Sequence, residues 1–533
     1  MSAARYTGER RREPVIQRSW TRTVVLDGLI LTGWMVSVGM VVLHEHGQLF
    51  GGVGNPTTSL VASIESKSQW FGIYYQGQKI GFSQTTLMPD ESQGIPGVTV
   101  DDRGQLSFNL LGTPQRIEAT AHAFIDASWR VQQFSATLKT ATTLLQWSGR
   151  RNGDELLVTV TTPTSVLTKR LRDPTGGAFV NGLSSWAAFH RLRVGQSGKA
   201  WLLNPLALNP EMVYFTVRRL ETFVGKPAYV VETDVRGLTT TSWVTPDGEV
   251  LRETSPLGWE LRQEPRAQAV TVPNPSTPAQ DLLSATAVPL NRPLDVPGRI
   301  VRLTLLVEGL GPHDVSVQRP WQRVLPPETL RAFGRTPPSG VWCVMQLDRP
   351  VRTHTVEPLP ASLKRYVRPS VFVQSEDARI ETRAAKIIGT RSDPWERMAA
   401  LNQWVYRTLR KRLTVGLPSA VDILNTPEGD CHEHTVLFTA LARSVGLPTR
   451  MVAGLVYSQG ALFYHAWPEV WLGTWIPTDP TLGQLVADAT HFGLIEAENE
   501  ALIGLGQYVG RLRVDVLAVD EQVPADVPAQ AAP

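Results

Sequence analysis

Three residues in the C-terminal part of the sequence have the types and order that thiol catalysis requires. Cys431 lies in a Gly-Asp-Cys run, His465 in Tyr-His-Ala-Trp, and Asp479 in Asp-Pro-Thr. A cysteine thiolate can attack an acyl carbon, an imidazolium can stabilise the thiolate and later protonate the leaving amine, and a carboxylate can fix the imidazole tautomer. We therefore predict Cys431 as the nucleophile, His465 as the base and Asp479 as the residue that orients the imidazole.

The flanking sequence predicts elements that would bring these residues together. An apolar stripe at helical spacing predicts a helix after Cys431 that ends at Gly446. Cys431 would then lie at the helix N-terminus, where unpaired N–H groups and the helix dipole stabilise a thiolate and lower the cysteine pKa. Runs 450–457 and 463–472 predict two strands, the second carrying His465, and 474–478 predicts a third that leads to Asp479.

Other polar residues in this region are interpreted as structural. His432 and His434 are two positions apart and would point to different helix faces, so we predict no metal site, and we predict no cofactor. Glu433 is expected to form a hydrogen bond or an ion pair within the core, and His491 is interpreted as structural. Cys343 is most simply a buried apolar cysteine, although an oxidising compartment would permit a disulfide with Cys431 that blocks the nucleophile.

Three segments of the sequence together resemble a known family. GDCHEHTVLFTALARSVGLPTRMVAGLVY, YHAWPEVWLGTWIPTDPT and ADATHFGL are similar to the transglutaminase-like superfamily, in particular its bacterial extracytoplasmic branch, over residues 375–500. The resemblance implies a papain-like α+β core in which the nucleophile helix packs on an antiparallel sheet, with the triad on Cys431, His465 and Asp479. The sequence departs from the family pattern at His432, where a small residue is common, and at Pro468, which can bend the strand that carries His465.

The expected activity is acyl transfer from a protein or peptide amide through an acyl-thioester at Cys431. Water as the acceptor would make the protein a cysteine protease or amidase, and an amine would make it a crosslinking enzyme. The sequence leaves these two acceptors open. The alternative from another functional class is a non-catalytic envelope protein in which an N-terminal β-rich domain binds a partner and the C-terminal core is a scaffold.

The N-terminal 43 residues predict a membrane anchor. Residues 1–22 hold six arginines and two acids, a net charge of +4, and residues 24–43 are apolar apart from Asp27. Twenty helical residues span about 30 Å, one hydrocarbon core. Since positive flanks stay in the cytoplasm, we expect a single-pass helix (residues 23–43) in the inner membrane and an extracytoplasmic, periplasmic body. A cleavable signal peptide is the alternative, but its apolar region is shorter and small residues follow it, whereas His-Glu-His follows here.

The amino-acid composition excludes several classes of protein. The 533 residues carry a net charge of +3 (52 Lys and Arg, 49 Asp and Glu), so the chain after the basic tail sums to −1. This excludes the basic surplus typical of nucleic-acid-binding proteins. Two cysteines exclude a disulfide-stapled scaffold or a multi-cysteine metal cluster.

The chain as a whole is predicted to be α+β, with several regions. Residues 44–66 are a linker and 67–264 an antiparallel β-rich domain, in which Gln76-Gly77-Gln78 is expected to form a hairpin turn. Residues 265–297 hold seven prolines and are a predicted linker. Residues 298–372 are a small β module or the edge of the core, 373–510 the core, and 511–533 a tail with a disordered end.

Overall fold

The structure is a computed structural model. It describes residues 66–521 except 111–112, 127–129, 142–143, 165, 173–191, 205–208, 236–237, 256–257, 273–285, 312–318, 353–359, 413–417, 497–504 and 506–507. The predicted basic tail, membrane helix and most of the first linker lie outside these residues. Within the described ranges, no helix is both long enough and apolar enough to cross a membrane.

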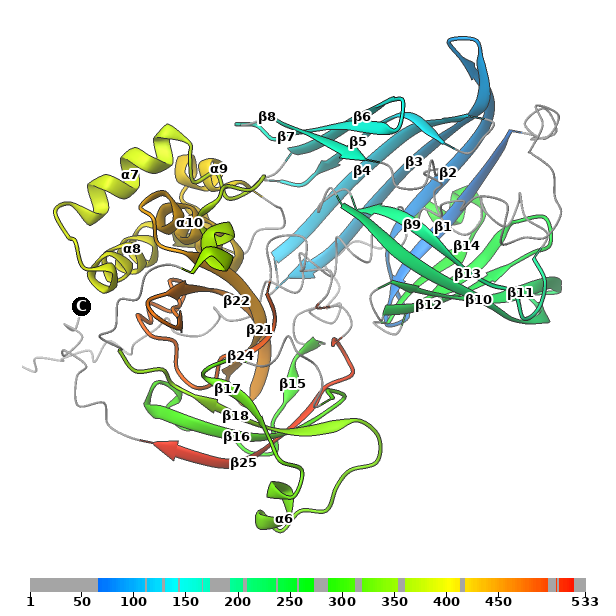
Figure 1. The fold of residues 1–533 in the computed structure, drawn as a ribbon. Helices are drawn as coiled ribbons and strands as arrows, with labels where there is room; N and C mark the ends of the chain where they lie inside the picture. The colour runs from blue at the N-terminus through cyan, green and yellow to red at the C-terminus, as the bar shows by residue number, and fades with distance from the viewer. Residues whose placement is uncertain are drawn as a thin grey trace, which may run out of the picture.

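The N-terminal region is one antiparallel sheet of fourteen strands, in the order β8-β7-β6-β5-β4-β3-β2-β1-β14-β13-β12-β11-β10-β9. Two meanders, β1 to β8 and β9 to β14, are therefore joined where β1 pairs with β14, and Figure 1 shows the sheet bending between them. The strands are β1 (Lys67–Tyr75), β2 (Gln78–Ser92), β3 (Ile95–Leu110), β4 (Thr113–Asp126), β5 (Val131–Lys139), β6 (Leu144–Asn152), β7 (Glu155–Thr161), β8 (Val166–Arg172), β9 (Ser197–Asn204), β10 (Asn209–Phe223), β11 (Lys226–Val235), β12 (Leu238–Val244), β13 (Val250–Thr254) and β14 (Trp259–Gln263).

Alternating side chains explain why this region forms a sheet. In β7, Leu156, Val158 and Val160 are buried while the residues between them are exposed or half-buried, as expected for a strand with one buried face. The predicted turn at Gln76-Gly77 is confirmed, since both residues have positive φ, 47° and 82°, between β1 and β2. The predicted antiparallel β-rich region is thus confirmed.

The C-terminal body is built on a second sheet, in the order β15-β22-β21-β24, with β23 also paired to β22. Its strands are β15 (Val288–Pro289), β21 (Thr449–Ser458), β22 (Ala461–Trp471), β23 (Trp475–Pro477) and β24 (Phe492–Glu496). The helices α7 (Ala378–Ile388), α8 (Pro394–Thr408), α9 (Ala420–Asn425) and α10 (Cys431–Ser444) gather on one side of β21 and β22 (Figure 1). Helix α10 lies directly against both strands, and its apolar side packs with α7, α8 and α9.

A third sheet lies on the other side of β21 and β22 (Figure 1), in the order β17-β18-β16-β25. Its strands are β16 (Ile300–Glu308), β17 (Gln322–Leu325), β18 (Trp342–Asp348) and β25 (Arg513–Glu521). Shorter elements are α4 (Arg266–Ala269), α6 (Thr329–Ala332), η1 (Pro297–Arg299), η3 (Ala361–Val367) and the parallel pair β19 (Arg410–Lys411) and β20 (Glu428–Gly429).

Two predicted boundaries are wrong. Residues 513–521 form strand β25 rather than part of a tail, because Val514 and Val516 are buried where β25 pairs with β16. The predicted linker 265–297 also ends earlier than expected: Val288 and Pro289 pair with β22, and the Asn291 side chain accepts a hydrogen bond from Val516 N–H at 2.8 Å. The described residues are mostly β, and the longer helices belong to the C-terminal body.

Candidate active site

The first turn of α10 holds Cys431 through a reciprocal capping arrangement. The Asp430 side chain accepts a hydrogen bond from His432 N–H at 2.8 Å, and Glu433 Oε2 accepts one from Asp430 N–H at 2.8 Å. A Cβ on Gly429 would lie 2.4 Å from the Glu433 side chain, so only glycine lets Glu433 fold back in this way. The expected hydrogen-bonding role of Glu433 is confirmed, and the Gly-Asp-Cys run is explained by this cap.

The Cys431 thiol is enclosed. Its exposed fraction is 0%, and the Ala466 N–H group of β22 donates a hydrogen bond to it. Burial raises the pKa of the Cys431 thiol well above its ordinary value, and the charges of Asp430, Asp479 and Glu433 add to this, whereas the Ala466 hydrogen bond opposes it. In this enclosed state the shift is therefore upward, opposite to the direction expected from the helix N-terminus, because burial and nearby carboxylates disfavour the thiolate.

His465 lies in β22, and one of its two ring nitrogens forms a hydrogen bond. Its Nε2 lies 2.7 Å from Asp479 Oδ2, whereas its Nδ1 is buried and makes no hydrogen bond among the described residues. The Trp467 ring stacks near it, with ring centroids 6.1 Å apart. The possible bend at Pro468 is not observed as a break in the ladder, since β22 pairs with β21 through Pro468 without a register shift.

Asp479 follows β23 in a tight loop that saturates its carboxylate. Oδ1 accepts hydrogen bonds from Thr481 N–H at 2.7 Å and from Leu482 N–H at 2.9 Å, and Oδ2 contacts His465. Burial alone would raise the pKa of Asp479, but the charges and hydrogen bonds of His465 and His491 hold it well below its usual range. Asp479 is therefore an ionised, fully buried carboxylate beside the His465 ring.

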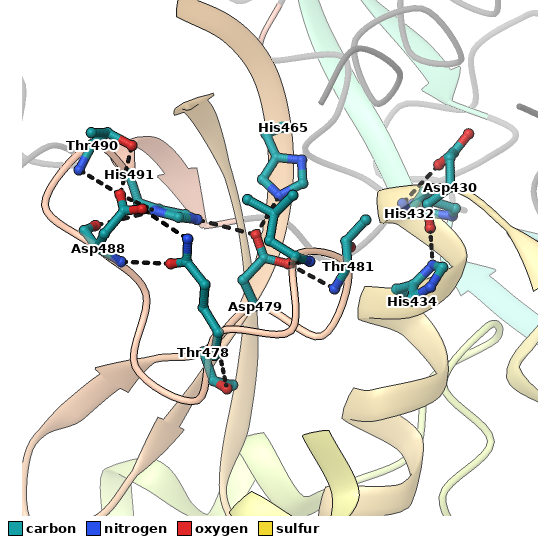
Figure 2. A network of polar contacts seen from close by, with 12 residues as sticks. Asp430, His432, His434, His465, Thr478, Asp479, Thr481, Asp488, Thr490 and His491 are labelled. Carbon is teal, nitrogen blue, oxygen red and sulfur yellow. Dashed lines mark hydrogen bonds and ion pairs between the residues drawn. The ribbon is translucent and has the colours of Figure 1, made fainter. Parts of the chain in front are cut away.

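His491 is the site residue that the sequence analysis did not recognise. Its Nε2 lies 3.1 Å from Asp479 Oδ2, and its Nδ1 lies 3.1 Å from the Asp488 carbonyl oxygen and 3.3 Å from Asp488 Oδ1 (Figure 2). The two imidazoles thus share one carboxylate oxygen. Its place in the ADATHFGL segment, which contributes to the family resemblance, was the available signal, but nothing local in the sequence indicated contact with Asp479.

His491 is held as a cation by its neighbours. Burial would lower the pKa of His491, but the hydrogen bonds and charges of Asp479 and Asp488 raise it to about 9. The ligand atoms of His465, Asp479 and His491 all lie within 4.8 Å of one another, a spacing that a metal ion can also use. A metal ion would need an unprotonated nitrogen from each histidine.

The remaining candidate residues are His432, His434 and Cys343. His434 Nδ1 contacts the Asp430 carbonyl oxygen at 2.5 Å, and burial lowers the pKa of His434 to about 4. His432 is also buried within α10. Cys343 is buried in β18, and neither Cys343 nor Cys431 forms a disulfide, so the Cys431 thiol is not blocked by one.

The raised pKa of His491 predicts a pH-dependent contribution to stability. The pKa of His491 is about 6.5 in the unfolded chain and about 9 in the folded protein. Protonation of His491 therefore adds at most about 3 kcal/mol to the free energy of unfolding, fully below pH 6.5 and not at all above pH 9. Urea unfolding of wild type and His491→Gln should show a gap that is largest at pH 6 and closes by pH 9.5. His122→Gln, in the exposed pair with Asp101, is the control. A gap that is constant over this pH range would contradict the prediction.

Comparison with known proteins identifies a family for part of the chain. Residues 381–480 match the sequence profile of the transglutaminase-like superfamily, and no curated protein matches the chain. A candidate cysteine protease of Cytophaga hutchinsonii is 17% identical over 40% of this chain and 82% of its own, with a TM-score of 0.27. A β-barrel-like protein of a domain of unknown function from Brucella abortus is 11% identical over 37% of this chain and 94% of its own, also with a TM-score of 0.27.

A candidate protease of Parabacteroides distasonis is 9% identical over 56% of this chain and 71% of its own, with a TM-score of 0.18. TM-scores this low carry no argument about function. The profile match is independent of them and spans the helix with Cys431, the strand with His465 and the loop with Asp479. Residues 381–480 of this chain therefore belong to the transglutaminase-like superfamily.

Proposed function

We propose that this protein is a thiol enzyme that forms an acyl-thioester at Cys431 from a protein or peptide amide. The observation that carries the proposal is the buried His465–Asp479 pair, joined at 2.7 Å, on the strand whose Ala466 N–H group donates to the Cys431 thiol. Nδ1 of His465 is the ring nitrogen that Asp479 leaves free for proton transfer.

The proton balance of the reaction follows from these groups. The Cys431 thiol gives its proton to His465 Nδ1, and the sulfur attacks the amide carbon. The resulting imidazolium then returns that proton to the leaving amine nitrogen as the C–N bond breaks, which leaves the acyl group on sulfur. Water or a second amine, deprotonated by His465, then takes the acyl group and restores the thiol. Asp479 holds Nε2–H throughout and supports the transient charge on the ring.

Because the Cys431 thiol is enclosed, a substrate must first gain access to it. Cys431, His465 and Asp479 are each 0% exposed, so an amide must displace part of the cover before it reaches the sulfur. Since a free thiolate is disfavoured in this enclosed state, ionisation depends on proton transfer to His465 rather than on the helix dipole alone.

A covalent probe tests the proposal directly. Peptidyl acyloxymethyl ketones, which need a nucleophilic thiolate, are expected to add one label to the wild type, located at Cys431 by peptide mass spectrometry. Cys431→Ala should take no label and His465→Ala should lose nearly all of it, whereas Cys343→Ser should label like the wild type. Absence of labelling across a peptide series, or label on Cys343 instead, would contradict the proposal and favour the non-catalytic envelope role. The product with added lysine amine or with water alone would identify the acceptor.

We also propose that residues 23–43 anchor the protein in the inner membrane with its body outside the cytoplasm. The support is the charge of +4 before an apolar stretch of one bilayer thickness. Protease added to intact spheroplasts should digest the body and leave the N-terminal tail protected. Complete protection of the body would contradict this topology.

A further inference from the structure

We infer that His491 is a positioning residue that fixes the Asp479 carboxylate against His465 and offsets part of its negative charge. The inference rests on the proposed function, because it concerns how Asp479 acts on the proposed base. It assigns a role to a residue outside the Cys431, His465 and Asp479 set.

The Asp479 carboxylate is held at both of its oxygens. Asp479 Oδ1 is held by two backbone N–H groups, and Oδ2 lies between two imidazole nitrogens at 2.7 and 3.1 Å. Without His491, Oδ2 would keep only the His465 contact, and the carboxylate would be restrained by the loop on one side alone. Two imidazoles on one oxygen leave the carboxylate no freedom to turn away from His465.

His491 is itself held in place by a closed circuit of hydrogen bonds (Figure 2). Asp488 Oδ1 accepts from Thr490 N–H at 2.9 Å and from the Thr490 hydroxyl at 2.6 Å. Gln484 donates to Asp488 Oδ2 at 2.8 Å, and the Gln484 backbone pairs with the Asp479 backbone at 2.8 and 2.9 Å. The circuit therefore runs from Asp479 through Gln484, Asp488 and His491 back to Asp479.

The circuit is anchored to the helices as well. Asn402 of α8 is buried and donates to the Thr478 hydroxyl at 2.7 Å and to the Gln484 carbonyl oxygen at 3.2 Å. On the other side, the Trp467 ring lies edge-on to His491, with centroids 5.1 Å apart. A side chain fixed from this many directions is suited to holding a carboxylate at one position.

His491 also changes the charge of the loop that carries Asp479. The charged and titratable groups that face His491 are Asp479 and Asp488 from its own loop and His465 from β22, whose ring centroid is 6.0 Å away. Asp479 also interacts with Cys431 and His434 of α10 and with Lys411 of β19. The elevated pKa of His491, about 9, makes it the cation between two carboxylates at neutral pH. The loop then carries a net charge of −1 instead of −2 beside His465 and Cys431.

Two substitutions change this charge in opposite directions. His491→Gln keeps a hydrogen-bond donor but leaves Asp479 and Asp488 uncompensated, so the His465 imidazolium becomes more stable and the thiol harder to ionise. Asp488→Asn keeps the shape of the anchor while removing one negative charge, so the imidazolium becomes less stable. A residue that only supports the fold would not produce shifts of opposite sign.

The experiment measures the rate of Cys431 alkylation by iodoacetamide against pH in the full chain, with sites identified by mass spectrometry. Iodoacetamide is neutral and reacts with the thiolate, so the rate rises in two limbs, one at each ionisation of the Cys431–His465 pair. In His491→Gln both rising limbs are expected to move up by about one pH unit, and in Asp488→Asn both are expected to move down. His122→Gln should retain the wild-type profile. If His491→Gln fails to fold, as judged by its thermal unfolding, Asp488→Asn carries the test alone.

The results separate this inference from the proposed function. A wild-type profile that His465→Ala leaves unchanged would contradict the proposed function itself. The role of His491 alone would be overturned by a different result. In that case the wild-type profile depends on His465, but the limbs are unshifted in whichever of His491→Gln and Asp488→Asn fold.

Discussion

Asp479→Ala is expected to lower kcat/KM by about 10⁴-fold, the loss seen when the orienting carboxylate of a comparable triad is removed. Within the part of the chain that the structure describes, Asp479 is the only hydrogen-bond acceptor of His465 Nε2, at 2.7 Å in a fully buried setting. Without it, the ring spends less time in the tautomer that leaves Nδ1 free for the thiol proton, and the imidazolium loses its buried counter-charge.

The matched variant Asp479→Asn tests this reason. Its amide keeps the shape of the carboxylate but can present an N–H group to Nε2, which favours the wrong tautomer, so we expect a loss of the same size as for alanine. Asp247, a largely exposed residue in the turn between β12 and β13, serves as the control, and Asp247→Ala should leave the rate unchanged. Single-turnover acylation should show the loss in the chemical step. A loss of less than tenfold in Asp479→Ala would contradict the assignment.

Because the pKa of Asp479 is depressed, its ionisation contributes little to the pH dependence of the reaction rate. A carboxylate whose folded-state pKa lies below its unfolded value contributes stability above about pH 4, and the contribution is lost only as pH falls through the folded pKa. Asp479 therefore stays ionised across the working pH range. We expect the acid limb of the rate profile to belong to the thiol and imidazole, and to persist in Asp479→Asn at its much lower rate.

Glu469→Ala is expected to destabilise the C-terminal body by about 3–5 kcal/mol, the usual cost of removing one partner of a buried ion pair. Glu469 lies in β22 with 0% exposure between two buried arginines. Arg450 donates to its Oε2 from Nε at 2.7 Å, and Arg319 Nε lies 3.4 Å from its Oε1. Burial already lowers the pKa of Arg319, and the Glu469 charge opposes that shift.

Without Glu469, both guanidinium groups would remain buried, with Glu496 as the partly exposed counter-charge of Arg450. Urea unfolding followed by tryptophan fluorescence should show the loss, because Trp321 and Trp475 lie beside these arginines. Glu118→Ala is the control, since its pair with Arg116 is solvent-exposed and the medium already screens it. Equal effects of the two substitutions would show that the buried network contributes no more than a surface pair.

Much of the local structure could be predicted from the sequence. The helix predicted after Cys431 corresponds to α10, and the strands predicted at 450–457 and 463–472 correspond to β21 and β22. Runs with alternating apolar residues, such as 155–161, became strands. Strand β3 has only a weak local pattern, because Gly97, Asp101 and Gly104 interrupt it, and pairing with β2 and β4 on both sides overrides that weak propensity.

Some features of the candidate site could likewise be predicted from the sequence, and others could not. The residue types and spacing of Cys431, His465 and Asp479 were sufficient to select them, because helix start, strand and turn are each encoded by neighbouring residues. Only the tertiary structure decided the pKa of Cys431, since burial depends on everything that covers the thiol. It also decided that His491 reaches Asp479, because the loop between them folds back on itself, and that β25 pairs with β16 about 200 residues earlier. Contacts between distant parts of the chain depend on how the whole body packs, which no local pattern records.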